Sequence, residues 1–342
     1  MILEKDASVL GYPGETSKAL DADHHNVCKY DGPHDPNYIL VRNVLKSLVS
    51  KALTSSEPSN VTETTSKRKS SDLKSLLAMT DLPDIDYIFF RDRWAEGTSQ
   101  WILEDEKYLT WFNPASTPNR SSILWLNGGP GTGKSVLSSF VIDDITKRHL
   151  CCQYFFIRSG DQKKRTLSLL LRCFAYQLSR SVPEFLERAL DVADEGIDFE
   201  TADARTIWER LFKSLLFRLQ DIPEPLYWII DGVDEAADPR SIFKQFSDIS
   251  LSSLNIRILL VSRRTSELSA AFSRIPSTLN PDIISIEGHL EDVRCYVRNE
   301  LSTTTSDENL EAIVERIVDG SGNNFLVSEP IRVWQHSLLT CC

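Results

Sequence analysis

Eight consecutive residues of the chain have the types and the order that bind phosphate groups. They read Gly-Gly-Pro-Gly-Thr-Gly-Lys-Ser and fit the pattern G-x-x-x-x-G-K-[ST]. Glycines let such a loop curl until its backbone N–H groups point at phosphate oxygens, and a helix N-terminus adds favourable dipole charge for an anion. The predicted phosphate-binding residues are Gly128, Gly129, Pro130, Gly131, Thr132, Gly133, Lys134 and Ser135.

Two of these side chains have distinct predicted roles. We expect Lys134 to bridge the β- and γ-phosphates of a nucleoside triphosphate, and Ser135 to supply a hydroxyl ligand to Mg²⁺, which prefers hard oxygen ligands. The alternative is a glycine-rich turn between a strand and a helix that matches the pattern by chance. Backbone groups that hold phosphates do not read the base, so the motif predicts ATP or GTP without choosing between them.

An acidic motif follows an apolar run farther along the chain. Residues Leu226 to Ile230 are apolar or aromatic, Asp231 ends the run, and Gly-Val-Asp-Glu comes next. We predict that Asp231 holds Mg²⁺ through water, and that Asp234 or Glu235 orients or deprotonates the water that attacks the γ-phosphate. An ordinary acidic turn after a core strand would be the simpler interpretation if the phosphate loop were missing.

Another predicted buried run, Arg257 to Val261, leads into Ser262-Arg263-Arg264. Ligands of open α/β sheets bind at the carboxyl ends of the strands, so we expect Arg263 to sense the γ-phosphate. The alternative is a solvent-facing arginine pair, because an arginine at a strand end needs no special reason. The predicted catalytic residues are therefore Asp234, Glu235 and Arg263.

Short β-rich runs alternate with amphipathic helices from residue 121 onward, which is typical of an α/β fold with a mainly parallel sheet. The candidate strands are Ile123–Leu126, Gln153–Ile157, Leu226–Asp231, Arg257–Val261 and Ile283–Ile286. The candidate helices are Lys134–Lys147, with Leu137, Phe140, Val141 and Ile145 on one face, Thr166–Arg180 and Thr206–Leu219. Strand, phosphate loop and helix thus follow one another in the order that phosphate binding requires.

Composition divides the chain into five parts. The expected parts are an N-terminal segment (1–50), a flexible linker (51–71), a helical segment (72–120), the NTPase domain (121–327) and an atypical tail (328–342). The linker is dominated by Ser, Thr, Glu and Lys, so it cannot bury enough apolar surface to repay the entropy of ordering. The helical segment regains aromatic side chains, and we expect these on helices and in packing roles: Trp94, Trp101, Trp111 and Phe112.

Overall composition excludes several functional classes. With 342 residues and 41% hydrophobic content, the chain can bury at least one sizeable core. A formal charge of −11 without a dominant Lys and Arg stripe argues against a nucleic-acid partner. Seven cysteines without a C-x-x-C pair favour a reducing compartment. Because we find no signal-peptide pattern and no apolar run long enough to span a bilayer, we predict a cytoplasmic protein without membrane contact.

The three motifs, in this order, resemble the NACHT branch of the STAND regulatory NTPases. Trp101 to Glu106 and Tyr154 to Phe156 are similar to stretches of the fungal NOD-like receptor version, of the nephrocystin-like N-terminal type. The resemblance covers residues 72–327. It implies a P-loop sheet of the additional-strand type with strand order 5-1-4-3-2. It also implies a slow ATP or GTP switch that is coupled to self-assembly into a homo-oligomer.

The two ends of the chain carry resemblances of their own. Asp23 to Tyr30 is similar to the closing segment of serine-esterase α/β-hydrolases that are fused to fungal NACHT modules, where His24 would match the catalytic base. Because these 342 residues contain no G-x-S-x-G motif, we interpret residues 1–50 as a remnant of an α/β-hydrolase C-terminal segment. Gly320 to Val327 resembles the run that leads into a winged-helix region. Ser328-Glu329-Pro330 interrupts it, so we expect a C-terminally truncated chain.

The sequence therefore predicts a nucleotide-dependent signalling module of a fungal NOD-like receptor with slow nucleoside triphosphatase activity. The resemblance places it in self and non-self recognition, of the heterokaryon-incompatibility kind. Two alternatives stay open: a P-loop phosphotransferase acting on a small molecule, and a truncated product without independent activity. The adjacent acids Asp234 and Glu235 suit water activation better than transfer to a metabolite.

Overall fold

The structure, a computed structural model, describes residues 38, 41–42, 45, 73–79, 83–113, 121–194, 196–220, 222, 225–286, 289–301, 310–321 and 325. Contacts divide the chain into two units, Met1–Glu63 and Thr64–Cys342, and each is described by itself. In the first unit, the described residues Tyr38, Val41, Arg42 and Leu45 are helical. The predictions for His24, for the linker 51–71 and for the tail 328–342 lie outside the described residues.

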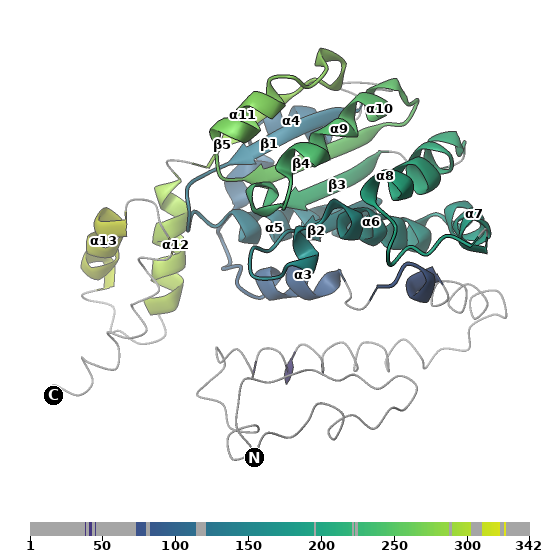
Figure 1. Ribbon diagram of the computed structural model, residues 1–342. Coiled ribbons are helices and arrows are strands. Elements are labelled where there is room, and N and C mark those ends of the chain that lie inside the picture. Colours follow the sequence, from purple (N-terminus) through teal and green to yellow (C-terminus); the bar gives the residue numbers. More distant parts are fainter. Residues whose placement is uncertain are drawn as a thin grey trace. The chain divides into compact units, whose positions relative to one another are not determined.

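A five-stranded parallel sheet lies at the centre of the second unit (Figure 1). The strands are β1 Ser122–Asn127, β2 Cys152–Phe156, β3 Leu226–Asp231, β4 Ile256–Ser262 and β5 Asp282–Ser285. Their order across the sheet is β2-β3-β4-β1-β5, and every neighbouring pair is parallel. This is the predicted 5-1-4-3-2 order read from the other edge, and each predicted strand end lies within one residue of the observed end. The predicted α/β fold with P-loop NTPase topology is confirmed.

Helices cover both faces of this sheet (Figure 1). The α-helices are α3 Asp84–Arg91, α4 Glu106–Phe112, α5 Lys134–Lys147, α6 Leu167–Ser181, α7 Pro183–Asp194, α8 Ala204–Ile207, α9 Pro239–Lys244, α10 Phe246–Leu251, α11 Ser266–Phe272, α12 Leu290–Leu301 and α13 Leu310–Ser321. Short 3₁₀ segments are η2 Gln100–Leu103, η4 Lys163–Arg165, η6 Leu216–Arg218, η7 Val233–Glu235 and η8 Ser277–Leu279, and η5 Trp208–Lys213 is a π-helix. Parallel strands connected by helices in this way bury the sheet on both sides.

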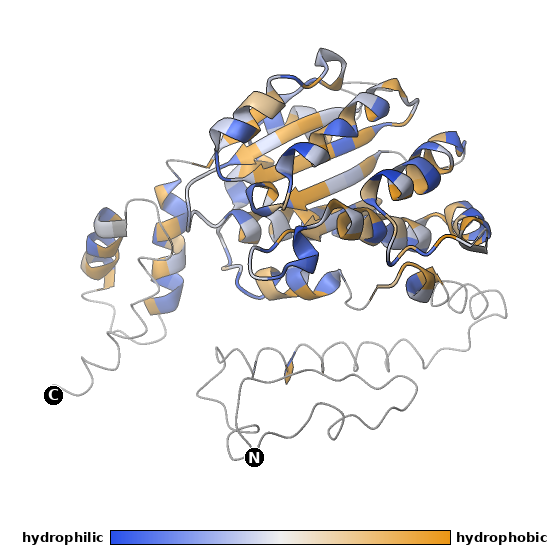
Figure 2. Cartoon of the chain, viewed as in Figure 1, coloured by the Kyte–Doolittle hydropathy of each residue, from blue (hydrophilic) through white to orange (hydrophobic). Residues whose placement is uncertain are grey.

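Each face of the sheet has its own hydrophobic core. In β1, Ile123 and Trp125 belong to the core formed with α6 to α11, whereas Leu124 and Leu126 pack with α3, α4 and α5. Figure 2 shows the result as orange strands between helices that carry both orange and blue residues. Because successive side chains of a strand point to opposite faces, a shift by one residue would exchange the contents of the two cores. The two cores therefore fix the register that places the strand ends.

Side-chain caps determine where several helices begin. Asp105 accepts hydrogen bonds from the backbone N–H groups of Lys107 and Tyr108, at 2.9 and 3.0 Å, and so starts α4. Thr166 and Thr265 cap α6 and α11 in the same manner. These oxygens satisfy backbone donors that the first helical turn leaves without partners, so the sequence itself sets these helix starts.

The predicted helix Lys134–Lys147 is α5, with the same bounds. Three of the four residues of its predicted apolar face are buried, whereas Phe140 is half-buried and stacks on Trp94, with ring centroids 5.7 Å apart. The prediction of Trp94 on a helix is wrong, because α3 ends at Arg91 and Trp94 lies in the turn that follows. The turn places the indole ring of Trp94 against Phe140 of α5.

The predicted single helix Thr206–Leu219 is wrong. The chain instead passes from α8 through the π-helix η5 into η6. In a straight α-helix, Trp208 and Phe217 would point in opposite directions, because about 3.6 residues make one turn. Here their rings are 5.6 Å apart in an edge-to-face contact, and Trp208 also meets Trp228 of β3 at 6.4 Å. Leaving the α-helix brings these rings together.

The helices α12 and α13 pack against each other through a small core of their own. Its buried members are Val293, Val297, Leu301, Leu310, Val314 and Val318. Two ion pairs connect the helices, from Arg294 to Glu315 and from Arg298 to Glu311, each with an N···O distance of 2.8 Å. The pair is therefore held by both apolar and charged contacts.

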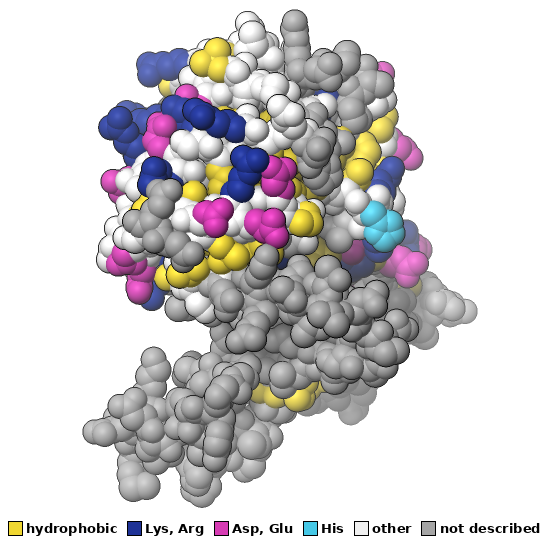
Figure 3. All heavy atoms as spheres, turned by 90° about the vertical axis from the view of Figure 1, so that its right-hand side faces the viewer, with side chains coloured by type: hydrophobic (Ala, Val, Ile, Leu, Met, Phe, Trp, Pro, Cys, Tyr) yellow, Lys and Arg dark blue, Asp and Glu magenta, His cyan; other side chains and the backbone are white. Residues whose placement is uncertain are grey.

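The described surface carries charges of both signs. Figure 3 shows one face, on which Lys and Arg side chains lie among Asp and Glu side chains. Across the described ranges, every helix is too short or too polar to cross a lipid bilayer.

Candidate functional site

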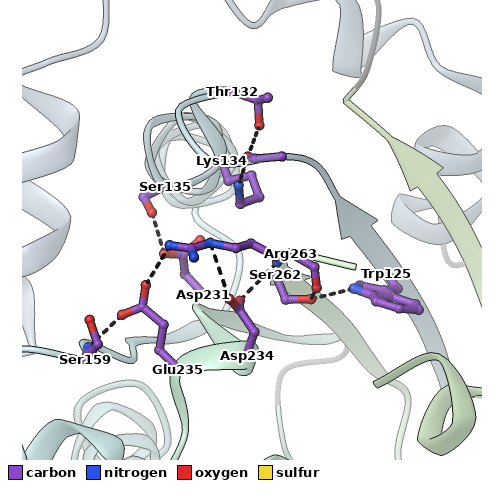
Figure 4. Close-up of polar contacts among 11 residues, drawn as sticks. Trp125, Thr132, Lys134, Ser135, Ser159, Asp231, Asp234, Glu235, Ser262 and Arg263 are labelled. Atoms are coloured by element: carbon purple, nitrogen blue, oxygen red, sulfur yellow. Dashed lines mark hydrogen bonds and ion pairs between the residues drawn. The ribbon is translucent and has the colours of Figure 1, made fainter. Parts of the chain in front are cut away.

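The predicted phosphate loop connects β1 to α5 at the carboxyl end of the sheet (Figure 4). Gly131 and Gly133 have φ angles of 75° and 79°, a backbone conformation that glycine adopts without the strain that a Cβ would cause. Gly133 immediately precedes the 14 residues of α5. The loop therefore curls directly in front of a helix N-terminus, where the dipole favours an anion.

Lys134 folds back over the loop. Its ammonium donates a hydrogen bond to the carbonyl of Gly129, and the hydroxyl of Thr132 donates to the same oxygen at 3.0 Å. Burial lowers the pKa of the Lys134 ammonium, while the negative charges of Asp231 and Asp234 act in the opposite direction. Among the described residues, the hydrogen-bond partner of this cation is the Gly129 carbonyl, which a phosphate oxygen can replace.

Asp231 ends β3 and lies against the first turns of α5, the helix that follows the phosphate loop. Its Oδ2 accepts a hydrogen bond from the Ser135 hydroxyl at 2.6 Å, and its Oδ1 accepts one from the Ser138 hydroxyl at 2.9 Å. Only 4% of the residue is exposed. Burial raises the pKa of Asp231 to about 6, and the two serine hydrogen bonds act against that rise. The structure brings together the two residues that we predicted as metal ligands, Ser135 and Asp231.

The three residues predicted to be catalytic meet at the ends of β3 and β4 (Figure 4). The backbone N–H of Arg263 donates to Asp234 Oδ1 at 3.0 Å, and Arg263 Nε lies 3.6 Å from Asp234 Oδ2. The guanidinium also lies 3.9 Å from Glu235, which accepts a hydrogen bond from the backbone N–H of Ser159 at 2.6 Å. The Arg263 side chain is 54% exposed, so the guanidinium is not enclosed, whereas the side chain of its partner Asp234 is only 10% exposed.

Close backbone packing fixes the acidic turn between these residues. Gly232 has a φ of 76°, and a Cβ at this position would lie 2.5 Å from the carbonyl oxygen of Ile157. On the neighbouring strands, the indole N–H of Trp125 donates to the Ser262 hydroxyl at 2.8 Å, which holds the end of β4 beside β1. The positions of Asp234 and Arg263 therefore follow from main-chain contacts and strand packing.

Three residues of the site were not predicted. Ser138 carries a readable signal, because it lies three positions after Ser135 and such residues share a helix face. Ser159 contacts Glu235 through its backbone, and a backbone contact leaves no signature in residue type. Phe325 contacts the phosphate loop through its N–H, which donates to the Gly131 carbonyl at 2.9 Å. Its ring lies so close to Gly133 that a Cβ there would be 3.2 Å from it.

The residues present fit a magnesium nucleotide. A hydroxyl and a carboxylate, both hard oxygen donors, lie 2.6 Å apart beside a loop that carries a lysine. Mg²⁺ is commonly held by one or two protein oxygens together with phosphate oxygens and water, so Ser135 and Asp231 are a sufficient protein contribution. The group that would hold the phosphates is the loop itself, with Lys134 as its cation.

The fold and the site define a P-loop nucleotide-binding module. Comparison with known families agrees, since the profile described as "Nephrocystin 3, N-terminal" matches residues 97–263, slightly under half of the chain. The chain is also 24% identical, over 214 residues, to the vegetative incompatibility protein HET-E-1 of Podospora anserina. That match covers 59% of this chain and 15% of the length of HET-E-1. These similarities support a NACHT-like NTPase.

Two solved structures are similar to part of the chain. One is the Orc1 protein of Aeropyrum pernix in complex with DNA, with a TM-score of 0.40, 14% identity, and coverage of 68% of this chain and 55% of that chain. The other is domain III of the replication initiation protein DnaA of Thermotoga maritima, with a TM-score of 0.33, 16% identity, and coverage of 74% of this chain and 92% of that chain. At these TM-scores, the fold assignment rests on the strand order and on the phosphate loop.

Proposed function

We propose that the chain is a nucleoside-triphosphate-binding signalling module of the NACHT type. It binds ATP or GTP together with Mg²⁺, and it hydrolyses the nucleotide slowly as a conformational switch. The observation that carries this proposal is the 2.6 Å contact between Ser135 and Asp231, which lie 96 residues apart in the sequence. It puts the two metal-binding oxygens side by side at the start of α5, next to the phosphate loop.

Lys134 and the loop bind the triphosphate in this proposal. The ammonium exchanges the Gly129 carbonyl for phosphate oxygens, which are charged and therefore stronger acceptors. When bound, Mg²⁺ would neutralise part of the negative charge of the phosphates. Ser135 and Asp231 would hold the metal ion in place relative to the loop, because each residue is fixed by the element that carries it.

We assign different roles to the two acids of the turn. Asp234 accepts the backbone N–H of Arg263 and also faces its guanidinium, so it positions the arginine. Glu235 touches the same guanidinium from farther away, at 3.9 Å, and is the residue we propose to orient the attacking water. Arg263 senses the γ-phosphate by leaving these carboxylates for it, which its 54% exposed side chain permits.

Phe325 offers a path from the nucleotide to the helical pair. It hydrogen-bonds Gly131 of the loop, and its ring meets Tyr296 of α12 at 5.6 Å. A change in the loop on nucleotide binding therefore reaches α12 through two contacts. This supports the switch that we propose, since a ligand shifts a conformation only through contacts that differ between two states.

The biological setting that we propose is a cytoplasmic fungal NOD-like receptor that assembles with copies of itself. HET-E-1 is by its name a vegetative incompatibility protein, which supports a role in self and non-self recognition. Because this chain spans only 15% of that relative, the activity of the whole relative is carried over as a proposal alone. The hydrolase remnant in residues 1–50 and the division into five parts belong to the same proposal.

Substitution of Lys134 tests the nucleotide assignment. Lys134→Ala should weaken binding of labelled ATP and GTP at least about 100-fold, because it removes the cation of the loop and leaves the phosphates with fewer charge-assisted hydrogen bonds. The measurement is equilibrium binding to purified protein with Mg²⁺ present. Lys147→Ala is the matched control, because Lys147 lies at the other end of α5, is 68% exposed, and pairs with Asp143. Wild-type affinity in Lys134→Ala would contradict the proposal.

A further inference from the structure

Ser138 lies one helical turn beyond the predicted metal ligand Ser135, on the same face of α5. Side chains three residues apart on a helix are neighbours, so both hydroxyls can reach the strand that passes beneath them. They do so at a single carboxylate: Ser135 donates to Asp231 Oδ2 and Ser138 to Asp231 Oδ1. Ser138 is 1% exposed and Asp231 is 4% exposed, so water does not compete for this contact.

The hydroxyl of Ser138 has two acceptors within reach but only one proton. Lys134 O lies at 3.1 Å, and Asp231 Oδ1 lies at 2.9 Å. A carboxylate is the stronger acceptor because it is charged, so the Ser138 hydroxyl donates its hydrogen bond to Asp231. A serine inside a helix commonly bonds a backbone carbonyl of the preceding turn instead. The neighbouring Ser139 does this, since its hydroxyl donates to the Val136 carbonyl at 2.7 Å.

We propose that Ser138 is a positioning residue for the metal-binding carboxylate of Asp231, an inference that rests on the function proposed above. One hydrogen bond leaves a carboxylate free to rotate about its last side-chain bond. A second bond, to the other oxygen, stops that rotation. Ser138 thereby keeps Oδ2 directed at Ser135, the hydroxyl that would bind Mg²⁺ with it, and it satisfies an oxygen for which the described residues offer no other hydrogen bond.

The experiment measures how nucleotide binding depends on Mg²⁺. Binding of a fluorescent nucleotide is followed in EDTA and across a Mg²⁺ titration, for wild type, Ser138→Ala, Ser138→Thr and Ser139→Ala. Ser138→Ala should raise the Mg²⁺ concentration at half-maximal effect about tenfold, because a hydrogen bond to a charged group is lost. Its binding in EDTA should stay within about twofold of wild type, since the loop and Lys134 are unchanged. Ser138→Thr keeps the hydroxyl and should restore the wild-type dependence.

Ser139→Ala is the matched control. Ser139 is also fully buried on α5, but among the described residues its hydroxyl bonds within the helix, to the Val136 carbonyl, so its loss should leave the Mg²⁺ titration unchanged. Binding in EDTA reports on the same samples whether each variant is folded. If wild type responds to Mg²⁺ and Ser138→Ala titrates like Ser139→Ala, the role of Ser138 is refuted while the proposed function stands. If wild type binds no nucleotide under either condition, the proposed function itself is refuted, and the inference with it.

Discussion

At the scale of single residues, Asp231 lowers the stability of the site that it serves. A carboxylate without water around it is costly, and the hydroxyls of Ser135 and Ser138 replace that water only in part. Burial accordingly raises the pKa of Asp231 to about 6. The desolvation cost of this buried carboxylate is offset when a cation binds it, as is common for strained functional groups.

Replacement of Asp231 by Asn should therefore stabilise the nucleotide-free protein near neutral pH. The folded pKa of Asp231, about 6, lies above its ordinary value of 3.8, so the folded state binds the proton more tightly than the unfolded state. The stabilisation from that proton is complete below pH 4 and is lost as the pH rises through 6. At pH 7.5, we expect Asp231→Asn to be more stable than wild type by about 1–3 kcal/mol, and the difference should shrink towards pH 4.

Urea unfolding at several pH values measures this difference directly. Asp144→Asn serves as the control, because Asp144 lies on α5, the helix whose Ser135 and Ser138 contact Asp231, and forms a surface ion pair with Arg148 at 2.9 Å. Its substitution should change stability by less than about 1 kcal/mol. A variant Asp231→Asn that is less stable than wild type at pH 7.5 would show that the carboxylate is not held at a cost.

At the scale of elements, the carboxylate of Asp292 helps to attach the start of α12 to the segment before the sheet. Asp292 Oδ2 accepts hydrogen bonds from the backbone N–H of Ser99 at 2.9 Å and from the indole N–H of Trp101 at 3.1 Å. The ring of His289 stacks on Trp101 with centroids 3.7 Å apart. Burial raises the pKa of Asp292 and lowers that of His289, as expected for a half-buried junction.

Asp292→Ala should loosen α12 without unfolding the sheet. Two N–H groups lose their common acceptor, so hydrogen exchange of residues 290–301 should become about tenfold faster while β1 and β4 keep their protection. Glu291→Ala is the control: Glu291 also lies in the first turn of α12, but it is 85% exposed and pairs only with Arg294 among the contacts described. Equal exchange in both variants would mean that the helix dipole, and not the junction, explains the effect.

The elements also show how far the sequence alone could go. Buried, mostly apolar runs predicted β1, β3 and β4, because a parallel strand covered on both faces is largely apolar, whereas shorter apolar or aromatic runs predicted the edge strands β2 and β5, which are only partly buried. The strand order required the resemblance, since no local pattern says which strands are neighbours. The helix Thr206–Leu219 failed because periodicity reports spacing along one helix, whereas the contact of Trp208 with Phe217 depends on a break in that helix.

The site likewise contains residues that the sequence could predict and residues that it could not. Gly128 to Ser135 could be predicted because the phosphate loop is continuous in sequence and its residues follow from its mechanism. The contact of Ser138 with Asp231 crosses 93 positions, and Phe325 lies farther still from Gly131. Both contacts depend on how the chain returns to the loop, which residue types do not record.

At the scale of the whole molecule, a switch requires that tri- and diphosphate states make different contacts. In the proposed switch, the γ-phosphate would compete with Asp234 and Glu235 for Arg263, so a triphosphate would release the acidic turn and a diphosphate would not. From the loop, the contact with Phe325 extends to α12. The proposed self-assembly should therefore depend on the γ-phosphate and on its binding by Lys134.

Light scattering coupled to size-exclusion chromatography can test this dependence. With Mg²⁺ and a non-hydrolysable triphosphate, the average mass should reach at least about twice the 38.8 kDa of one chain, whereas a diphosphate should leave single chains. The salt should be near the physiological concentration, because copies with a formal charge of −11 repel one another when screening is weak. Lys134→Ala should stay a single chain with either nucleotide, and Lys147→Ala should assemble like wild type. The same mass in every nucleotide state would separate nucleotide binding from assembly and remove the switch from the proposed function.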